Sequence, residues 1–197
     1  MNEKIVIRLV RLEDANELSE IYKPYVENTA VSFEYLAPDA KEFERRILEK
    51  IHTYPYLVAE VDGEIAGYCY ASSFLPRPAY SHSVETTLYI KEEFHGMGIG
   101  KMLYLKLEEL LKLQNVVSLN ACIAYAHNPD ETLNNISMLF HSKMGYRYVG
   151  KFNGSGYKFD RFYDMIWMEK LILPIDRQIE DFLPFSTVLS KAHELLG

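Results

Sequence analysis

The alternation of apolar and polar residues predicts strands and helices in the first half of the chain. Residues 4–10 alternate like a strand, and residues 13–27 carry apolar side chains at helical spacing. A second helix is expected to begin after Asp39, because the sequence DAKE places a Glu three residues beyond a capping Asp. Asp62-Gly63 can supply the positive φ angles of a two-residue turn, so we expect a β-hairpin over residues 56–72.

The second half continues with alternating strands and helices. The expected elements are a strand at 84–90, a helix at 102–113, a strand at 116–124, a helix ending near Met144, and strands at 147–153 and 162–170. The order is therefore strand, helix, helix, hairpin, strand, helix, strand, helix, strand, strand. This order predicts an α/β (α+β) fold in which helices pack on a mixed sheet.

The length of 197 residues predicts one domain with its own core. We assign residues 1–170 to that domain. Residues 171–197 are expected to be a C-terminal extension with a short helix near 187–196, packed on the domain or on a partner subunit, and not a separate domain.

Charge and hydropathy exclude two classes of partner. The net charge of −7 argues against a nucleic-acid-binding surface. No run of 18 apolar residues occurs, and the N-terminal 15 residues interleave charges with apolar residues, unlike a signal peptide. We therefore expect a cytoplasmic protein that binds neither nucleic acid nor membrane.

The two cysteines indicate neither a disulfide framework nor a metal site. Cys69 and Cys122 lie in apolar, strand-like runs and are expected to be buried, reduced thiols. No metal-ligand spacing relates them to the six histidines, so no metal is expected.

A glycine-containing segment, FHGMGIGK at residues 94–101, joins an expected strand to an expected helix. Such a loop exposes free backbone N–H groups at a helix N-terminus and can bind phosphate; the alternative is a tight turn that needs glycine for geometry alone. A P-loop would need glycine at His95 and Ser or Thr at Met102, and the dinucleotide fingerprint would need glycine at Lys101. The segment therefore predicts a phosphate-bearing ligand other than ATP, GTP or a dinucleotide.

Two further segments could carry chemistry. Within the strand 84–90, Glu85 shares one face with Thr87 and Tyr89; it is either a solvated glutamate or a partly buried base with a raised pKa. The expected helix at 134–144 has an apolar face and a mixed face. The apolar face comprises Ile136, Leu139, Phe140 and Met144, and the mixed face comprises Asn134, Ser137, Met138 and His141. An ordinary solvated face is the alternative to a functional cluster there.

The motifs resemble those of one enzyme superfamily. The spacing His95-x-x-Gly98-x-Gly100 resembles the (Gln/Arg)xxGxG pyrophosphate loop of GCN5-related N-acetyltransferases, and NNISMLFHSKMGY at 134–146 is similar to their NxxSxxLYEKxGF motif. Across residues 5–170 the chain resembles the phosphinothricin, methionine sulfone and methionine sulfoximine acetyltransferases of that superfamily. The matching segments are 31–38, 54–73, 77–80, 84–90, 95–101, 139–146 and 156–168.

This resemblance implies an acyl-CoA N-acyltransferase (GNAT) fold, with a mostly antiparallel sheet of six to seven strands and about four helices. It implies transfer of the acetyl group of acetyl-CoA to the α-amine of a small amino acid or analogue, by direct attack, in a homodimer. Acetylation of a protein N-terminus or another amine, and coenzyme A binding without turnover, stay open as alternatives.

The resemblance also implies roles for individual residues. Glu85 would be the base, and His141 would stand where many members have a tyrosine that protonates the thiolate. The positions that would bind the coenzyme are Leu88, Tyr89, Ile90, His95, Gly96, Met97, Gly98, Ile99, Gly100, Lys101, Asn134 and Ser137. The positions that would line the amino-acid pocket are Phe33, Arg77, Tyr80, Lys158 and Phe162, the last replacing a more usual tryptophan.

Overall fold

A seven-stranded sheet forms the centre of the molecule, with strand order β1-β2-β3-β4-β5-β7-β6. The computed structural model describes residues 4–176, 178 and 180–197. The strands are β1 (Ile5–Leu9), β2 (Tyr56–Val61), β3 (Glu64–Ser73), β4 (Ser83–Ile90), β5 (Ser118–Tyr125), β6 (Arg147–Lys158) and β7 (Arg161–Leu171). All neighbours pair antiparallel except β4 and β5, which are parallel. The predicted mixed, mostly antiparallel sheet is confirmed.

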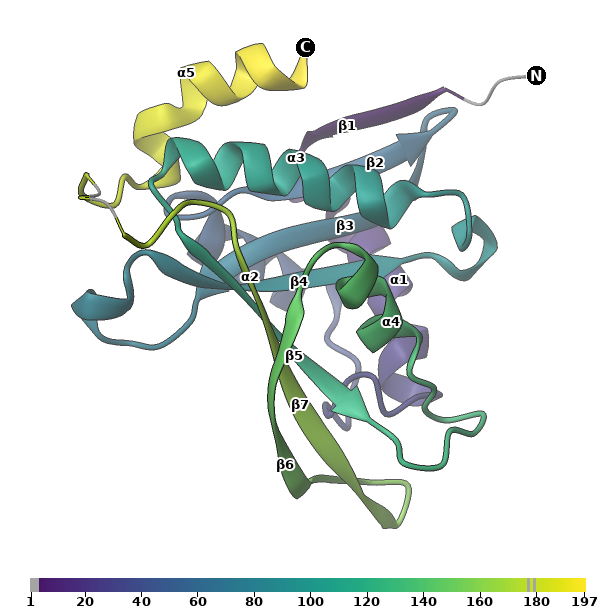
Figure 1. Cartoon of the computed structure of the whole chain (residues 1–197). Coiled ribbons are helices and arrows are strands. Elements are labelled where there is room, and N and C mark those ends of the chain that lie inside the picture. The colour runs from purple at the N-terminus through teal and green to yellow at the C-terminus, as the bar shows by residue number, and fades with distance from the viewer. Residues whose placement is uncertain (1–3, 177, 179) are drawn as a thin grey trace.

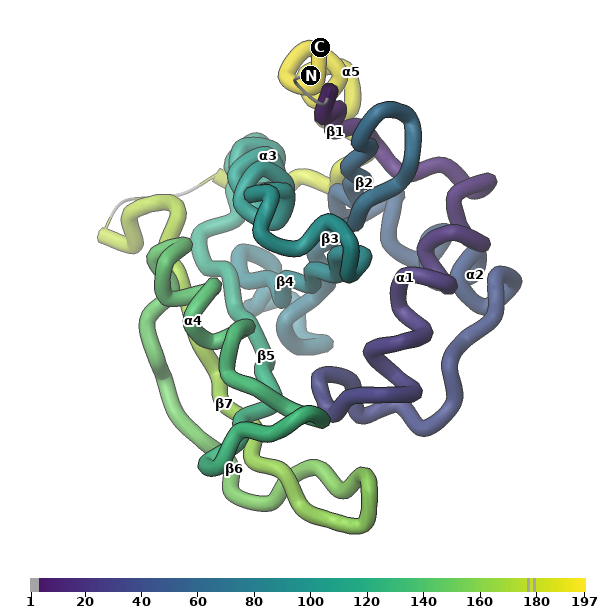
Figure 2. Tube along the Cα trace, turned by 90° about the vertical axis from the view of Figure 1, so that its right-hand side faces the viewer, coloured from purple at the N-terminus to yellow at the C-terminus, as the bar shows by residue number. Residues whose placement is uncertain are grey.

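The helices cover both faces of this sheet (Figures 1 and 2). They are α1 (Ala15–Glu27), α2 (Ala40–Ile51), α3 (Ile99–Leu113), α4 (Ile136–Lys143) and α5 (Phe185–Leu196). Helices α1 and α2 lie on one face, and α3, α4 and α5 lie on the other. The predicted order of strands and helices along the chain is confirmed.

The two turn and cap signals of the first half have the expected geometry. Asp62 and Gly63 have φ angles of 51° and 91° and join β2 to β3. The side chain of Asp39 accepts a hydrogen bond from the Glu42 N–H at 2.8 Å, which caps the first turn of α2.

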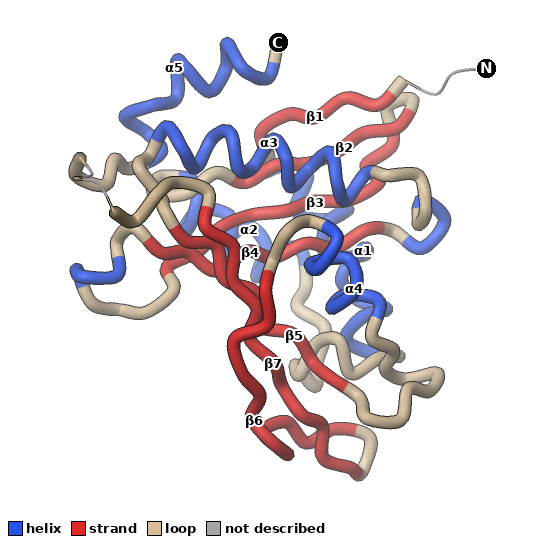
Figure 3. Tube along the Cα trace, in the orientation of Figure 1, coloured by secondary structure: helices blue, strands red, loops and turns tan. Residues whose placement is uncertain are grey.

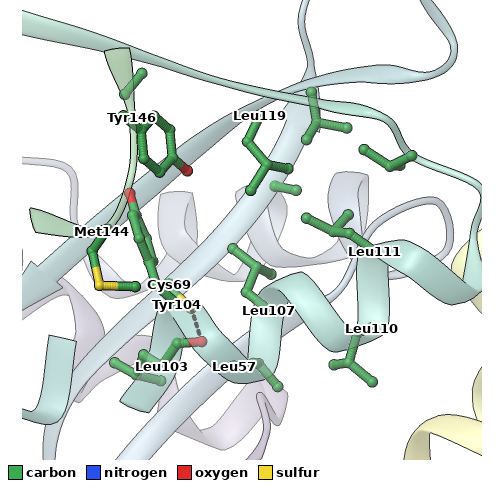
Figure 4. Close-up of a cluster of buried hydrophobic side chains, with 14 of the residues drawn as sticks. Leu57, Cys69, Leu103, Tyr104, Leu107, Leu110, Leu111, Leu119, Met144 and Tyr146 are labelled. Atoms are coloured by element: carbon green, nitrogen blue, oxygen red, sulfur yellow. Dashed lines mark hydrogen bonds between the residues drawn. The ribbon is translucent and has the colours of Figure 1, made fainter. Parts of the chain in front are cut away.

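The larger core lies between α3 and the sheet. Leu103, Leu107 and Leu111 are almost completely buried at i, i+4 and i+8 of α3, so one stripe of the helix faces the strands. Figure 4 shows these side chains beside Cys69 of β3 and Leu119 of β5. This packing fixes where the N-terminus of α3 meets the sheet.

Helix α5 packs on its own chain. Phe185, Val188 and Ala192 are buried in the core that contains α3. The Phe185 and Ser186 N–H groups donate to the carbonyl oxygens of Thr53 and His52 at 3.1 and 3.0 Å. The C-terminal extension therefore packs on the domain of its own chain, which is one of the two placements that the sequence left open. The domain boundary at residue 170 stays a prediction.

Strands β4 and β5 diverge soon after they pair (Figure 3). Only three residue pairs join them, the last being Glu85 with Asn120, whereas β4 pairs with β3 from Val84 to Ile90. One edge of β4 is therefore without a strand partner from Thr86 to Ile90. The candidate site lies at this divergence.

Candidate active site

The unpaired edge of β4 is the first component of the site. Beyond Glu85, backbone groups that point toward β5 have no partner in the sheet, which suits an extended ligand that pairs as an added strand. At the end of the edge, the Ile90 carbonyl accepts hydrogen bonds from the Tyr25 hydroxyl at 2.5 Å and lies 3.0 Å from His95 Nε2. Tyr25 and His95 thus fix the point where the glycine loop leaves the strand.

The glycine loop ends at the first turn of α3. Gly98 is the N-cap residue, with φ of 81°, and its carbonyl accepts the Met102 N–H at 3.1 Å. Gly96 also has φ of 81°, and added Cβ atoms at both positions would meet open space, so backbone conformation rather than crowding requires glycine there. The N–H groups of the first helical turn point away from the helix, which is the geometry of a phosphate site.

The third glycine has a different role. Helix α3 begins at Ile99, three residues earlier than predicted, so Gly100 is helical. A Cβ on Gly100 would lie 3.1 Å from Leu88 Cδ2 and 3.4 Å from the Phe140 ring. Gly100 therefore lets the start of α3 approach both β4 and α4.

Glu85 is a half-buried carboxylate on the face of β4 that α1 and α2 cover. Burial raises its pKa above the ordinary value of 4.5. No hydrogen bond or ion pair to this carboxylate occurs within the described residues. A desolvated, unpartnered carboxylate beside the unpaired edge of β4 is suited to act as a general base.

Cys122 lies near Glu85. It follows Asn120, the partner of Glu85, by two residues and therefore points to the same face. Cys69 is buried as expected, but Cys122 is exposed, because β5 is uncovered where it leaves β4. Partial desolvation, with the nearby Glu85 charge, raises the pKa of Cys122 to about 12. Its thiol is therefore protonated at neutral pH and a poor nucleophile.

His141 lies inside the protein and not on an open face of α4. Its side chain is buried with Met144, whereas Ile136 and Leu139 of the expected apolar face are 65% and 53% exposed. The expected division of faces is therefore wrong. The helix is rotated because Tyr104 of α3 and Tyr146, in the turn between α4 and β6, pack their rings against the imidazole at centroid distances of 5.5 and 5.0 Å.

Both ring nitrogens of His141 have partners. Nδ1 lies 2.7 Å from the Ser137 carbonyl, which can only accept, so Nδ1 carries the proton. Nε2 lies 3.1 Å from the Tyr104 hydroxyl and therefore accepts from it. Burial lowers the pKa of His141 to about 4, against the opposing effect of the Ser137 hydrogen bond, so the ring is neutral.

The hydrogen bonds continue from His141 to β4. The Thr86 hydroxyl lies 3.4 Å from the Tyr104 hydroxyl and 3.0 Å from that of Tyr146. Figure 4 shows the two tyrosine rings side by side where α3 faces the sheet. Sequence reasoning missed this network, because Tyr104, in an apolar stripe of α3, and Tyr146, in the turn before β6, look like core residues.

Comparison with known proteins decides the family. Residues 7–167 match the acetyltransferase (GNAT) domain family. The chain belongs to the GNAT family of acetyltransferases. It is an acetyl-CoA-dependent N-acetyltransferase.

Three similar proteins illustrate the range of relatives. A phosphinothricin N-acetyltransferase of Alcaligenes faecalis is 32% identical over 165 residues, which cover 83% of this chain and 81% of the relative. The crystal structure of a GNAT superfamily phosphinothricin acetyltransferase from Sinorhizobium meliloti, in complex with acetyl-CoA, has a TM-score of 0.77 and 28% identity over 87% of this chain and 89% of that one. A ribosomal-protein-alanine N-acetyltransferase from Brucella melitensis has a TM-score of 0.77 and 29% identity over 84% of this chain and 99% of that one.

Asn134 and Ser137 of this acetyltransferase lie at the start of α4. Asn134 precedes the helix, and its side-chain oxygen accepts the Ile136 N–H at 3.0 Å. The Ser137 hydroxyl lies 3.5 Å from His141 Nδ1. Asn135, which the sequence did not single out, holds the helix start by bonding both the N–H and the carbonyl of Ala126. Coenzyme contacts of Asn134 and Ser137 stay predictions.

Three of the predicted substrate residues come together around the β6–β7 hairpin. The Phe33 ring lies where a Cβ on Gly156 would overlap it, and Phe162 is 71% exposed at the start of β7. Lys158 is buried, and its Nζ donates to the carbonyl oxygens of Val26, Thr29 and Ser32 at 2.6, 2.9 and 2.7 Å. Lys158 therefore fixes the α1–α2 loop, and a direct contact with substrate stays a prediction.

Arg77 and Tyr80 lie elsewhere, in the loop between β3 and β4. Arg77 is exposed, and the half-buried Tyr80 packs against Phe74 at a centroid distance of 6.0 Å. This loop leads directly into the N-terminal end of β4, two residues before Glu85. The two groups of predicted substrate residues thus belong to separate segments of the chain.

The described part of the chain contains no cluster of three or more His, Cys, Asp or Glu side chains that could hold a metal ion. No helix in that part is both long and apolar enough to cross a membrane.

Proposed function

We propose that this acetyltransferase acetylates the α-amine of a small amino acid or analogue of the phosphinothricin, methionine sulfone or methionine sulfoximine type. The observation that carries this proposal is Glu85, a desolvated carboxylate with no partner among the described residues, beside the unpaired edge of β4. The names of several relatives support the substrate class.

Acetyl-CoA supplies an activated thioester when it is bound. The N–H groups of the first turn of α3 hold its pyrophosphate, and the free edge of β4 at Leu88–Ile90 pairs with its amide-containing arm. Glu85 takes the proton from the substrate ammonium, directly or through water, and a backbone N–H near Ile90 polarises the carbonyl that the amine attacks. Cys122 remains a protonated thiol, so transfer is direct.

His141 is proposed to assist the departing thiolate. With its proton on Nδ1 directed to Ser137, the ring has no N–H left for that thiolate in this geometry. Its catalytic role therefore needs a test separate from that of Glu85. Full activity of His141→Ala at saturating amine would show that the His141 role is wrong, and full activity of Glu85→Gln would show the same for Glu85.

Thiol release from acetyl-CoA tests the substrate class. Purified protein is assayed with amino acids, methionine sulfone, methionine sulfoximine, phosphinothricin, polyamines and short peptides. We expect release with small amino acids or analogues, abolished by Glu85→Gln. The likeness to a ribosomal-protein-alanine acetyltransferase favours a second candidate, a protein N-terminus. A strong signal with peptides alone would support that candidate and contradict the proposal.

We further propose a cytoplasmic homodimer without a nucleic-acid partner. The net charge of −7 and the family resemblance support this. Light scattering coupled to size-exclusion chromatography measures the oligomeric state.

A further inference from the structure

Two buried polar side chains lie at the point where β4 and β5 separate (Figure 3). They are Thr86 of β4 and Asn120 of β5, in the interior of a sheet whose buried positions are mostly apolar. A buried hydroxyl or amide costs stability unless it forms hydrogen bonds, so both side chains need partners inside the protein. We call these two side chains the strand clamp.

Each side chain of the strand clamp bonds the main chain of the opposite strand. The Asn120 Nδ2 group donates to the carbonyl oxygen of Val84 at 3.2 Å. The Thr86 hydroxyl lies 3.3 Å from the carbonyl oxygen of Asn120, which can only accept, so Thr86 is the donor. The last residue pair between the strands, Glu85 with Asn120, is therefore reinforced by side-chain bonds in both directions, and pairing stops directly after it.

The Thr86 oxygen also faces the tyrosines of the helical layer. With its own proton directed to Asn120, this oxygen accepts from the Tyr146 hydroxyl, which is 3.0 Å away. The Tyr104 hydroxyl lies 3.4 Å from the same oxygen and 3.1 Å from Nε2 of His141. One hydroxyl group therefore contacts four parts of the fold, namely β4, β5, α3 and the turn between α4 and β6.

Two of these parts carry the proposed coenzyme site. The free edge of β4 begins at Thr86, and Leu88–Ile90 on this edge is the segment proposed to pair with the coenzyme arm. Tyr104 lies in the second turn of α3, directly after the turn whose N–H groups are proposed to hold the pyrophosphate. A residue that holds β4 against α3 therefore sets the distance between the two halves of the ligand site.

We propose that Thr86 is a positioning residue of the coenzyme site, whose hydroxyl holds the free edge of β4 in place relative to β5 and α3. This rests on the proposed function, which places the coenzyme arm on that edge. Without the hydroxyl, the Asn120 carbonyl loses a donor and the Tyr146 hydroxyl loses an acceptor, so fewer bonds define where pairing ends. Thr86 acts through the backbone, because its side chain lies on the opposite face from Glu85.

Calorimetric titration with coenzyme A, in the absence of an amine, tests this role. Thr86→Val keeps the shape of the side chain without the hydroxyl, and Thr86→Ser keeps the hydroxyl. Thr87→Val is the matched control, because Thr87 is the next residue of the same edge and points to the other face. We expect the Kd to rise about fivefold or more in Thr86→Val, and by less than about twofold in Thr86→Ser and Thr87→Val.

A fragment of the coenzyme separates positioning of the edge from a general loss of structure. Adenosine 3′,5′-bisphosphate has phosphates but lacks the amide-containing arm, so Thr86→Val should bind it as wild type does. Equal weakening for the fragment and coenzyme A would show a general structural effect and overturn the proposal. Unchanged coenzyme A affinity in Thr86→Val, or an equal loss in Thr86→Ser or Thr87→Val, would also overturn it.

Tyr146→Phe provides a second variant if Thr86→Val does not fold. It keeps the ring and removes the hydroxyl that donates to Thr86. A higher Kd for coenzyme A alone would support the proposal, and an unchanged Kd would overturn it.

Failure of the proposed coenzyme placement gives a different result. If wild type bound the fragment as tightly as coenzyme A, the arm would not contribute to binding, and both its placement on β4 and the role of Thr86 would be wrong. Tighter binding of coenzyme A by wild type, with no effect of Thr86→Val, would overturn the role of Thr86 alone.

Discussion

Among single residues, Glu85 combines a strand position that is normally apolar with a carboxylate that nothing in the described chain neutralises. Its pKa is raised by burial, and a base must be ionised to act. We therefore expect kcat/KM to fall as the pH drops through this raised pKa, so that an acidic limb lies above pH 4.5. Glu85→Gln should lower kcat about 100-fold or more and remove that limb. If the acidic limb persisted in the pH–rate profile of Glu85→Gln, that limb would belong to another ionisable group.

His141 predicts a pH dependence of stability. Its pKa falls from 6.5 to about 4 on folding, so below pH 6.5 the unfolded chain takes up a proton that the folded chain does not. Between pH 7 and pH 5 this should lower the free energy of unfolding by about 2 kcal/mol. Urea unfolding of His141→Gln should lack this component, whereas His52→Gln, which alters an exposed histidine, should keep it. Equal pH dependence in all three proteins would contradict the assignment.

At the scale of elements, alanine substitutions of two glycines can distinguish an effect of backbone strain from an effect on ligand binding at the loop before α3. Gly98 and Gly63 both have positive φ with open space around them, but only Gly98 precedes the helix that we propose holds pyrophosphate. Alanine at either position should cost about 1–2 kcal/mol of stability. Only Gly98→Ala should also raise KM for acetyl-CoA severalfold, because the N–H groups of the first turn are displaced. If the two variants had the same KM for acetyl-CoA, the loop would not be part of the coenzyme site.

The order of elements could be predicted from the sequence because each strand and helix carries its own periodicity. The rotation of α4 could not, because it depends on Tyr104 and Tyr146, which lie outside α4 and pack against a buried imidazole. The face of Glu85 follows from alternation within one strand. The divergence of β4 from β5, which leaves an edge of β4 free and Cys122 exposed, follows from tertiary pairing that no local pattern records.

At the scale of the whole molecule, α5 is expected to contribute to the stability of the folded chain through its buried side chains. Phe185 is 3% exposed in the core that α3 shares, whereas Leu189 of the same helix is 38% exposed. Phe185→Ala should lower the free energy of unfolding by about 3–5 kcal/mol, and Leu189→Ala by less than about 1 kcal/mol. Urea unfolding measures both. A negligible effect of Phe185→Ala would mean that the helix contributes little to the fold of the isolated chain.

Lys158, which donates three hydrogen bonds that fix the α1–α2 loop, is synthesised long after that loop. The lysine follows Ser32, whose carbonyl it binds, by 126 residues. The ribosome therefore completes both helices around the α1–α2 loop, and both strands that flank the glycine loop's helix, long before it adds the residue that fixes Phe33 beside the β6–β7 hairpin. A nascent chain can thus assemble the proposed coenzyme site first, and the wall of the proposed amine site is completed only when the last fifth of the protein emerges.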